Sequence, residues 1–327
     1  MEREKKLEVF NRLSACTFEG VPGVAHFSGE GKGLTVGITV CTHGNEPAGL
    51  AAADYIFSYF EKNPLKIGEV FLVLNNIEAT KRYLHAKTDE ERSRTRFVDI
   101  NLNRLPEDMF NDSNETRYEI LRARELIPIW RRFTVGLDIH STSQDAEPML
   151  ISVGKLKNID HLSGFPVQKL ISNIDKVMQD RAVAEFFGSE ESEAYGLECG
   201  GHEQSSSFTV AVMCVRSLLE NLGMIDLTSR GTSQALEEYV VREAIFFPND
   251  SYVLTKIFKN FEPVKKGTVL AVGDDSDIVV QRDGHALFAP NTTKPIHRGE
   301  EVLFLTDPVR TYSRQGQSKH QDTRLKT

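Results

Sequence analysis

Two histidines and a glutamate stand at positions where they could share a metal ion. His43 and Glu46 are three residues apart, in a segment that follows an alternating apolar strand pattern and ends at Pro47. On a helical turn, residues i and i+3 face the same side, so an imidazole and a carboxylate at this spacing can bind one zinc ion. His140 follows a second apolar run and could be the third ligand, which leaves a fourth position for water. A helix start with a polar cap explains the first pair equally well.

Two carboxylates could support chemistry at such a metal. Asp138 lies two residues before His140 on the same strand face, so it could orient an imidazole. Glu198 ends another apolar run, where a buried carboxylate is costly unless it is paired or functional. It is a candidate general base that takes a proton from water and passes it to a leaving nitrogen. The alternatives are a satisfied polar pair for Asp138 and His140 and a salt bridge for Glu198. Cys199 is expected to be a packed small residue, not a nucleophile.

An arginine-rich segment could bind the substrate. Arg104 can hold a carboxylate through two parallel hydrogen bonds, and Asn103 can add a donor. Arg96 could polarise a carbonyl group and stabilise the oxyanion that develops on it. The alternative is a solvated loop, and this is the interpretation we adopt for Arg92 and Arg94, which belong to a charged run.

Strand and helix patterns alternate along the first 230 residues and would position these side chains. Alternating or continuous apolar runs predict strands at 34–41, 69–74, 134–139 and 194–199. Helices are predicted at 47–60, at 115–131 with Glu119, Arg122 and Glu125 facing water, and from about residue 206 with Ser206 or Ser207 as N-cap. This alternation predicts an α/β fold, a mixed sheet flanked by helices, whose strand ends carry the site. Residues 154–193 give no clear assignment.

The pattern changes near residue 230. Short β-rich runs separated by turn residues predict a small all-β barrel or sandwich at 231–307. Few apolar residues follow residue 308, so we expect a disordered tail at 308–327. The predicted organisation is therefore a catalytic α/β domain at 1–230, a small β domain and a tail.

Composition excludes several classes of function. The 327 residues carry a net charge of −8, which argues against nucleic acid as a partner. The apolar runs fall well short of the roughly 18 residues that span a bilayer. The charged start shows no secretory signal, and the four cysteines lack a CxxC spacing. We therefore expect a cytoplasmic protein with free thiols and no membrane partner.

Four motifs occur in an order that resembles a known enzyme family. They are HGNE at 43–46, Asn103-Arg104 within VDINLNR, DIHS at 138–141 and LECG at 197–200. Together they resemble the succinylglutamate desuccinylase/aspartoacylase family over about residues 30–305, and more distantly the zinc carboxypeptidases. The resemblance implies a zinc carboxypeptidase-like fold with a C-terminal β barrel. It also implies one zinc ion on His43, Glu46 and His140, an α-carboxylate on Asn103 and Arg104, an acyl carbonyl on Arg96, and Glu198 as the base.

The function that the resemblance implies is zinc-dependent hydrolysis of the amide bond of a small anionic N-acyl amino acid. A charged segment at 89–94 and the Cys-Gly-Gly-His sequence after Glu198 depart from the family pattern, so the acyl group and the amino acid stay open. The alternative enzyme is a zinc carboxypeptidase acting on a peptide or peptidoglycan-like substrate. A non-catalytic binding module is a third interpretation, suggested by lipoyl-like features at 264–267. The native metal and homo-oligomerisation stay open, because His and carboxylate ligands accept several divalent ions.

Overall fold

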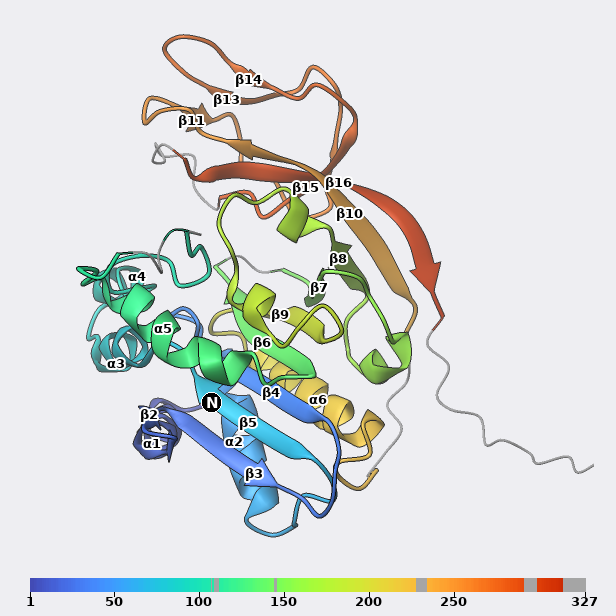
Figure 1. The fold of residues 1–327 in the computed structure, drawn as a ribbon. Coiled ribbons are helices and arrows are strands. Elements are labelled where there is room, and N and C mark those ends of the chain that lie inside the picture. Colours follow the sequence, from blue (N-terminus) through green and yellow to red (C-terminus); the bar gives the residue numbers. More distant parts are fainter. Residues whose placement is uncertain (107, 109–111, 144–145, 228–233, 291–298, 314–327) are drawn as a thin grey trace, which may run out of the picture.

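A large mixed sheet runs through most of the molecule (Figure 1). The computed structural model describes residues 1–327 apart from 107, 109–111, 144–145, 228–233, 291–298 and 314–327. Eleven of the described strands form the sheet, which confirms the predicted mixed sheet. In order across it they are β12 (Pro263–Val264), β15 (Gly284–Leu287), β16 (Glu301–Tyr312), β10 (Leu236–Phe246), β8 (Lys169–Ser172), β7 (Met149–Val153), β9 (Glu193–Gly201), β6 (Val135–Thr142), β4 (Thr35–Val40), β5 (Glu69–Leu74) and β3 (Val24–Ser28).

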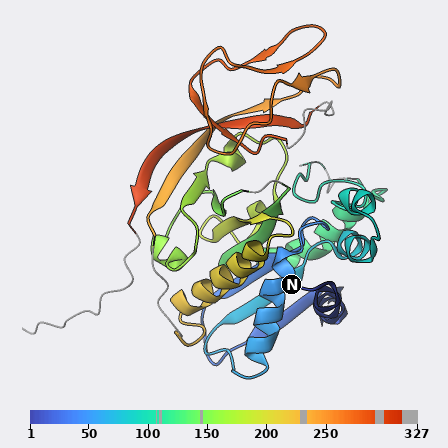
Figure 2. The same cartoon turned by 180° about the vertical axis from the view of Figure 1, so that it is seen from behind.

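Helices lie on both faces of this sheet. They are α1 (Arg3–Ala15), α2 (Ala48–Phe60), α3 (Ile77–His85), α4 (Asp89–Ser93), α5 (Tyr118–Trp130) and α6 (Ser205–Asn221), with short 3-10 helices η2 (Ile159–Leu162), η3 (Ile174–Lys176) and η4 (Val183–Phe186). Apolar residues of α1, α2 and α6 share one buried cluster with the sheet, and those of α5 and η4 form a second cluster on the opposite face. Figures 1 and 2 show these two sides in turn.

Strand β4 shows how the sequence sets the two layers. Its residues Val36, Ile38 and Val40 are fully buried on the side of α2 and α6. On the other side Gly37 lies against Phe133, so closely that a β-carbon at Gly37 would overlap the aromatic ring. The alternation of large and small residues therefore lets aromatic side chains approach one face of the sheet, as strand geometry requires.

Strand β6 is central and brings the ends of several strands together. It pairs in parallel with β4 on one side and with β9 on the other. Parallel neighbours end at the same edge of a sheet, where loops with functional residues are commonly built. His43 follows the end of β4, and His140 and Glu198 lie in the last residues of β6 and β9.

The C-terminal strands are less separate than the sequence suggested. Strand β10 pairs in parallel with β8 and antiparallel with β16, so both long strands continue the main sheet. The small β domain expected at 231–307 is supported in part: besides these shared strands, the segment contains a separate three-stranded antiparallel sheet of β11 (Val253–Leu254), β13 (Val269–Val272) and β14 (Ile278–Val279). A buried cluster that includes Phe247, Phe258 and Leu303 nevertheless forms a core within this segment. The expected boundary at residue 230 lies outside the described residues.

Three further expectations are corrected. Strand β16 extends to Tyr312, so residues 308–312 are ordered against β10, whereas the rest of the expected tail from residue 314 lies outside the described residues. Helix α6 begins at Ser205 after Gln204, ahead of the expected caps. Glu119 and Arg122 of α5 are buried instead of facing water. The unassigned stretch 154–193 contains β8 and three 3-10 helices.

Two general properties agree with the sequence. All four cysteines are free thiols, and three of them are buried. Across the described residues, no helix is both long enough and apolar enough to cross a bilayer.

Candidate active site

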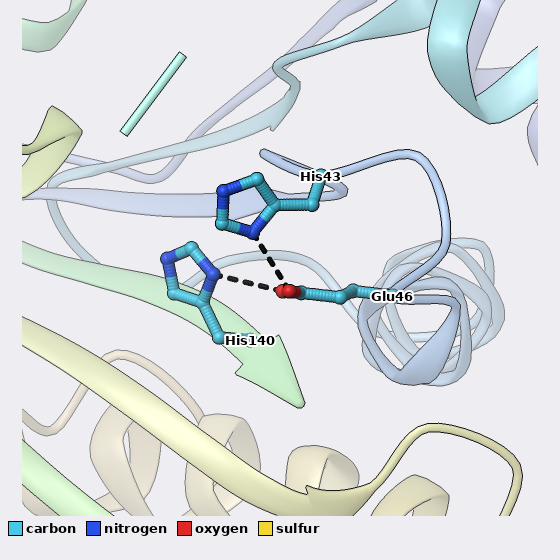
Figure 3. Close-up of side chains that lie close together, drawn as sticks. All are labelled: His43, Glu46 and His140. Atoms are coloured by element: carbon cyan, nitrogen blue, oxygen red, sulfur yellow. Dashed lines mark hydrogen bonds and ion pairs between the residues drawn. The ribbon is translucent and has the colours of Figure 1, made fainter. Parts of the chain in front are cut away.

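His43, Glu46 and His140 form one buried cluster (Figure 3). The Nδ1 atom of His43 lies 2.7 Å from Oε1 of Glu46, and Nδ1 of His140 lies 2.9 Å from Oε2. One donor atom of each residue lies within 4.8 Å of the others. The three side chains predicted as metal ligands therefore converge, although the two histidines come from segments almost a hundred residues apart.

The outer nitrogen of each imidazole is held by a second residue. Nε2 of His43 lies 2.8 Å from Oδ1 of Asn101, and Nε2 of His140 lies 2.7 Å from Oδ2 of Asp138. Oδ1 of Asn101 also accepts the backbone N–H of Asn103, which identifies it as the oxygen of the amide. Both imidazoles thus donate from Nε2 and direct Nδ1 toward Glu46, the arrangement that metal-binding histidines require.

The contact between His43 and Glu46 fits a cation. When Nε2 of a neutral imidazole carries the proton, Nδ1 presents a lone pair. Burial, reinforced by the nearby Arg96 guanidinium, lowers the pKa of His43 to about 4, so this imidazole is neutral at pH 7. A lone pair then faces a carboxylate oxygen at 2.7 Å. Such a pair of acceptors is stabilised by a positive charge between them, and a donor set of two imidazoles and one carboxylate suits zinc.

The charges around the cluster are strongly coupled. Burial opposes ionisation of Glu46, but His43 and His140 outweigh it and hold the pKa of Glu46 well below its usual range. Burial also opposes the charged form of His140, whereas Asp138 and Glu46 raise its pKa well above the ordinary value. In the metal-free protein the cluster is therefore an anionic carboxylate held between a neutral imidazole, His43, and a protonated one, His140.

Backbone geometry at the first pair depends on a glycine. A β-carbon at Gly44 would overlap the backbone of Ala79 and Thr95. Its N–H donates to the carbonyl oxygen of Arg96 at 2.8 Å, which ties this turn to the arginine segment. The close approach of these chains requires a residue without a side chain at position 44.

Sheet register places Glu198 beside His140. The two residues are direct partners in the parallel pair of β6 and β9. Oε2 of Glu198 is buried and has no hydrogen-bond partner among the described residues. Burial raises the pKa of Glu198 to about 7. A carboxylate with a buried, unpaired oxygen that can exchange a proton near neutral pH has the properties of a general base.

The predicted substrate-binding residues lie on the same cavity but already have partners. Arg96 contacts Oε1 of Glu46 through Nη1 at 3.1 Å. The side-chain oxygen of Asn103 accepts the backbone N–H of Val183. Arg104 pairs with Glu301 through Nε at 3.0 Å and Nη2 at 2.9 Å. The seven residues predicted from the sequence all line one cavity of about 1360 Å³, which also reaches α1 and β16.

Three residues of this region were missed or misplaced by the sequence analysis. Asn101 was not assigned a role in the sequence analysis, although it lies only two residues before the predicted substrate-binding residue Asn103. Glu119 accepts the backbone N–H groups of residues 98–100 and so fixes the loop that leads to Asn101. His202 faces the cavity, and its Nδ1 lies 2.9 Å from Oγ of Ser141, next to His140.

Comparison with solved structures finds the same architecture in several enzymes. A succinylglutamate desuccinylase from Vibrio parahaemolyticus matches with a TM-score of 0.68 and 17% identity, covering 88% of this chain and 87% of that one. The succinylglutamate desuccinylase of Vibrio cholerae matches at 0.68 and 14%, covering 94% and 95%. Murine aminoacylase 3 matches at 0.56 and 20%, covering 86% and 98%. A scan against protein-family models finds no match, and neither does a search of curated proteins.

These matches define the class of fold. The structural neighbours of this chain are proteins of the succinylglutamate desuccinylase/aspartoacylase family, including aminoacylase 3. The chain has their fold over most of its length, as the sequence motifs implied.

Proposed function

We propose that this protein is a zinc-dependent hydrolase that cleaves the amide bond of a small N-acyl amino acid. The observation that carries the proposal is the buried His43–Glu46–His140 cluster with the unpaired carboxylate of Glu198 beside it. The fold shared with desuccinylases and an aminoacylase supports the same class of reaction. In this proposal residues 1–230 form the catalytic part, and 231–307 form a β-rich part that closes the cavity.

The residues present suit a zinc ion, which His43, Glu46 and His140 would hold. When bound, zinc supplies Lewis acidity and lowers the pKa of a water ligand to about 7. Asp138 and Asn101 fix the imidazole tautomers, so both Nδ1 atoms stay available.

Glu198 is the base in this proposal. Its carboxylate takes a proton from the attacking water and delivers that proton to the leaving nitrogen of the amide. Arg96 lies within 3.1 Å of Glu46, so its guanidinium can donate to the oxygen of the scissile carbonyl as negative charge develops there.

Asn103 and Arg104 hold the α-carboxylate of the substrate. The contacts of Arg104 within the described chain use Nε, Nη1 and Nη2 once each, and a guanidinium has five N–H donors. Two donors therefore remain for a carboxylate. Binding at this point fixes the amide bond relative to Glu198, which raises the effective concentration of the reacting groups.

The first test is metal content per chain of the purified protein, compared with a His43→Ala, His140→Ala double variant. We expect about one zinc per wild-type chain and almost none in the variant. Hydrolysis would then be followed on N-acyl amino acids, with N-succinylglutamate and N-acetylaspartate first, and on peptides that release a C-terminal residue. Failure of the wild type to bind zinc refutes the proposal and favours a non-catalytic binding module. Zinc-dependent release from peptides alone favours a carboxypeptidase.

A further inference from the structure

The guanidinium of Arg104 faces a carboxylate that the chain itself supplies. Both Nε and Nη2 contact the same oxygen of Glu301, the first residue of strand β16. Both side chains are partly buried, with about a quarter of each exposed, and both line the cavity. Arg104 therefore presents a neutralised pair to the substrate instead of a free positive charge.

The other basic residues on the described lining also have partners, and in three of the four the partner is a carboxylate. Lys6 pairs with Glu203, Arg92 with Asp89 and Arg96 with Glu46, and Arg3 donates to the carbonyl oxygen of Leu84. Acidic residues outnumber basic ones there, with eleven Asp or Glu against five Arg or Lys. The arginines alone suggested an anionic substrate, but the complete lining has an excess of negative charge.

Part of this excess lies on the cavity wall formed by the stretch 174–186. Asn103 binds the backbone of Val183, which joins the arginine segment to the stretch 174–186. Asp175 of this stretch lines the cavity with only 5% of its side chain exposed. Its Oδ2 pairs with Lys176, whereas Oδ1 is buried without a hydrogen-bond partner among the described residues. A buried carboxylate oxygen without a donor costs free energy, which a cationic ligand would recover.

Glu185 adds a second carboxylate to this wall. It lines the cavity, and its Oε1 accepts the backbone N–H of Ala182 at 2.7 Å. Burial raises the pKa of Glu185, and the neighbouring charge of Asp175 contributes in the same direction. Together they outweigh the backbone N–H of Ala182 and the cations Arg181 and Lys176, which lower this pKa. Two carboxylates that repel one another on one wall are both stabilised when a positive group lies between or beside them.

We propose that the amino-acid part of the substrate carries a cationic side chain, which Glu301 and Asp175 recognise while Arg104 holds the α-carboxylate. The substrate class is thus an N-acylated diamino acid such as an N-α-acyl derivative of lysine or ornithine. This inference rests on the proposed deacylase function, because it names the substrate of the same cavity.

The test compares three compounds of similar length with different end groups. They are N-α-acetyl-L-lysine, N-α-acetyl-L-norleucine and N-acetyl-L-2-aminoadipate, which end in an ammonium group, a methyl group and a carboxylate. Hydrolysis by the zinc-containing protein is measured as kcat/KM. Binding of free L-lysine, L-norleucine and L-2-aminoadipate is measured by calorimetry, which needs no turnover. We expect the lysine compounds to be preferred by about tenfold to a hundredfold, the usual worth of a hydrogen bond to a charged group.

Two variants locate the preference. Glu301→Gln and Asp175→Asn should each reduce the ratio of lysine to norleucine by about tenfold or more, and Glu301→Gln should also improve binding of the aminoadipate compound. Glu243→Gln is the matched control, since Glu243 is an exposed residue of β10 away from the cavity lining. It should leave every ratio unchanged. Melting temperatures of all variants show whether each one is folded.

The outcomes separate this inference from the proposed function. Hydrolysis of all three acetyl compounds with no preference for lysine overturns the cationic subsite and leaves the deacylase intact. Tighter binding of lysine without hydrolysis of any acetyl compound supports the subsite and refutes the acetyl group as the acyl part, and the deacylase is then judged by the assay on N-succinylglutamate. A preference for lysine that survives in both Glu301→Gln and Asp175→Asn overturns the assignment to these residues.

Discussion

Replacing Asp138 by asparagine should weaken zinc binding through the tautomer of His140. Oδ1 of Asp138 accepts hydrogen bonds from the hydroxyls of Thr39 at 2.6 Å and Thr42 at 2.8 Å, while Oδ2 faces Nε2 of His140 at 2.7 Å. A carboxylate can accept all three hydrogen bonds, but an asparagine has only one oxygen. Keeping both threonine bonds places the amide nitrogen against Nε2, so the imidazole proton moves to Nδ1. That nitrogen is the one directed at Glu46 and the metal site.

The expected loss of zinc affinity follows from the two orientations that the amide group of the asparagine can take. If the amide turns its oxygen to His140, its nitrogen takes the place of the acceptor of the two hydroxyl protons, and each donor that loses its acceptor costs about 1 kcal/mol. If it does not turn, the unfavourable tautomer must be reversed before metal binds. Either route costs about 1.4–2.7 kcal/mol, which corresponds to about 10–100-fold weaker zinc binding and agrees with the usual effect of removing such a partner.

A competition titration against a chromophoric zinc chelator at pH 7.5 measures this effect. The control is Thr39→Val, which removes one donor to the same carboxylate and leaves the contact with His140 in place. It should weaken zinc binding by less than about 0.7 kcal/mol, or threefold. Thermal melts without zinc show that both variants are folded. If folded Asp138→Asn binds zinc as tightly as the wild type, Asp138 does not set the imidazole tautomer.

Three further predictions concern Glu198 and the sheet. Glu198→Gln should retain zinc and lower kcat by about 10²–10⁴-fold, and a near-normal kcat in steady-state assays would rule out this base. In the presence of a chelator, the same variant should be more stable than the wild type at pH 8. The reason is that the raised pKa of about 7 costs the folded protein about 3 kcal/mol once the pH exceeds that value. Urea unfolding at pH 8 and pH 5 tests this, since the gain should largely vanish at pH 5, where the folded protein keeps its proton. Gly37→Ala should destabilise the folded protein by about 1–3 kcal/mol or more, because its methyl group meets Phe133. Gly196→Ala is the control and should be tolerated, because its methyl group would make ordinary contacts with Ile151. Equal urea midpoints for the two variants would contradict the packing argument.

The candidate metal ligands could be predicted because the sequence patterns that identify them are local. His43 and Glu46 share one turn, and His140 ends a strand whose apolar pattern is plain in the sequence. Parallel strands bring their ends to one edge of the sheet, so the meeting of these segments follows from the fold class alone. Glu198 was found for the same reason, since its strand neighbours that of His140.

Apart from Asp138, which lies two residues before His140, the partners of these residues could not be predicted, because they come from distant parts of the chain. Asn101 meets His43 across 58 positions, and Arg104 meets Glu301 across 197. Glu119 has the polar character of an exposed helix position, but it is buried because three backbone N–H groups of the preceding loop need an acceptor. Hydrophobic periodicity predicts which face of a helix or strand is buried, but it carries no information on such long-range hydrogen bonds.

How the C-terminal strands join the main sheet could not be predicted, for a related reason. Their short runs and turn residues resemble a separate small β fold, and part of the segment does have its own buried cluster. Sequence patterns do not reveal which edge of a sheet a later strand joins. The pairing of β10 with β8 added these strands to the main sheet.

The place of β16 in the sheet also bears on how the protein is made. Every candidate metal ligand precedes residue 141 and Glu198 follows, but Glu301 is synthesised about a hundred residues after Glu198. A chain that stops before β16 would keep the proposed metal centre and lack the carboxylate that faces Arg104. It would also expose the backbone of the 11-residue strand β10 along the edge that β16 normally covers, and an open edge of that length invites pairing with other chains. Incomplete copies are therefore expected to aggregate instead of acting as unselective enzymes.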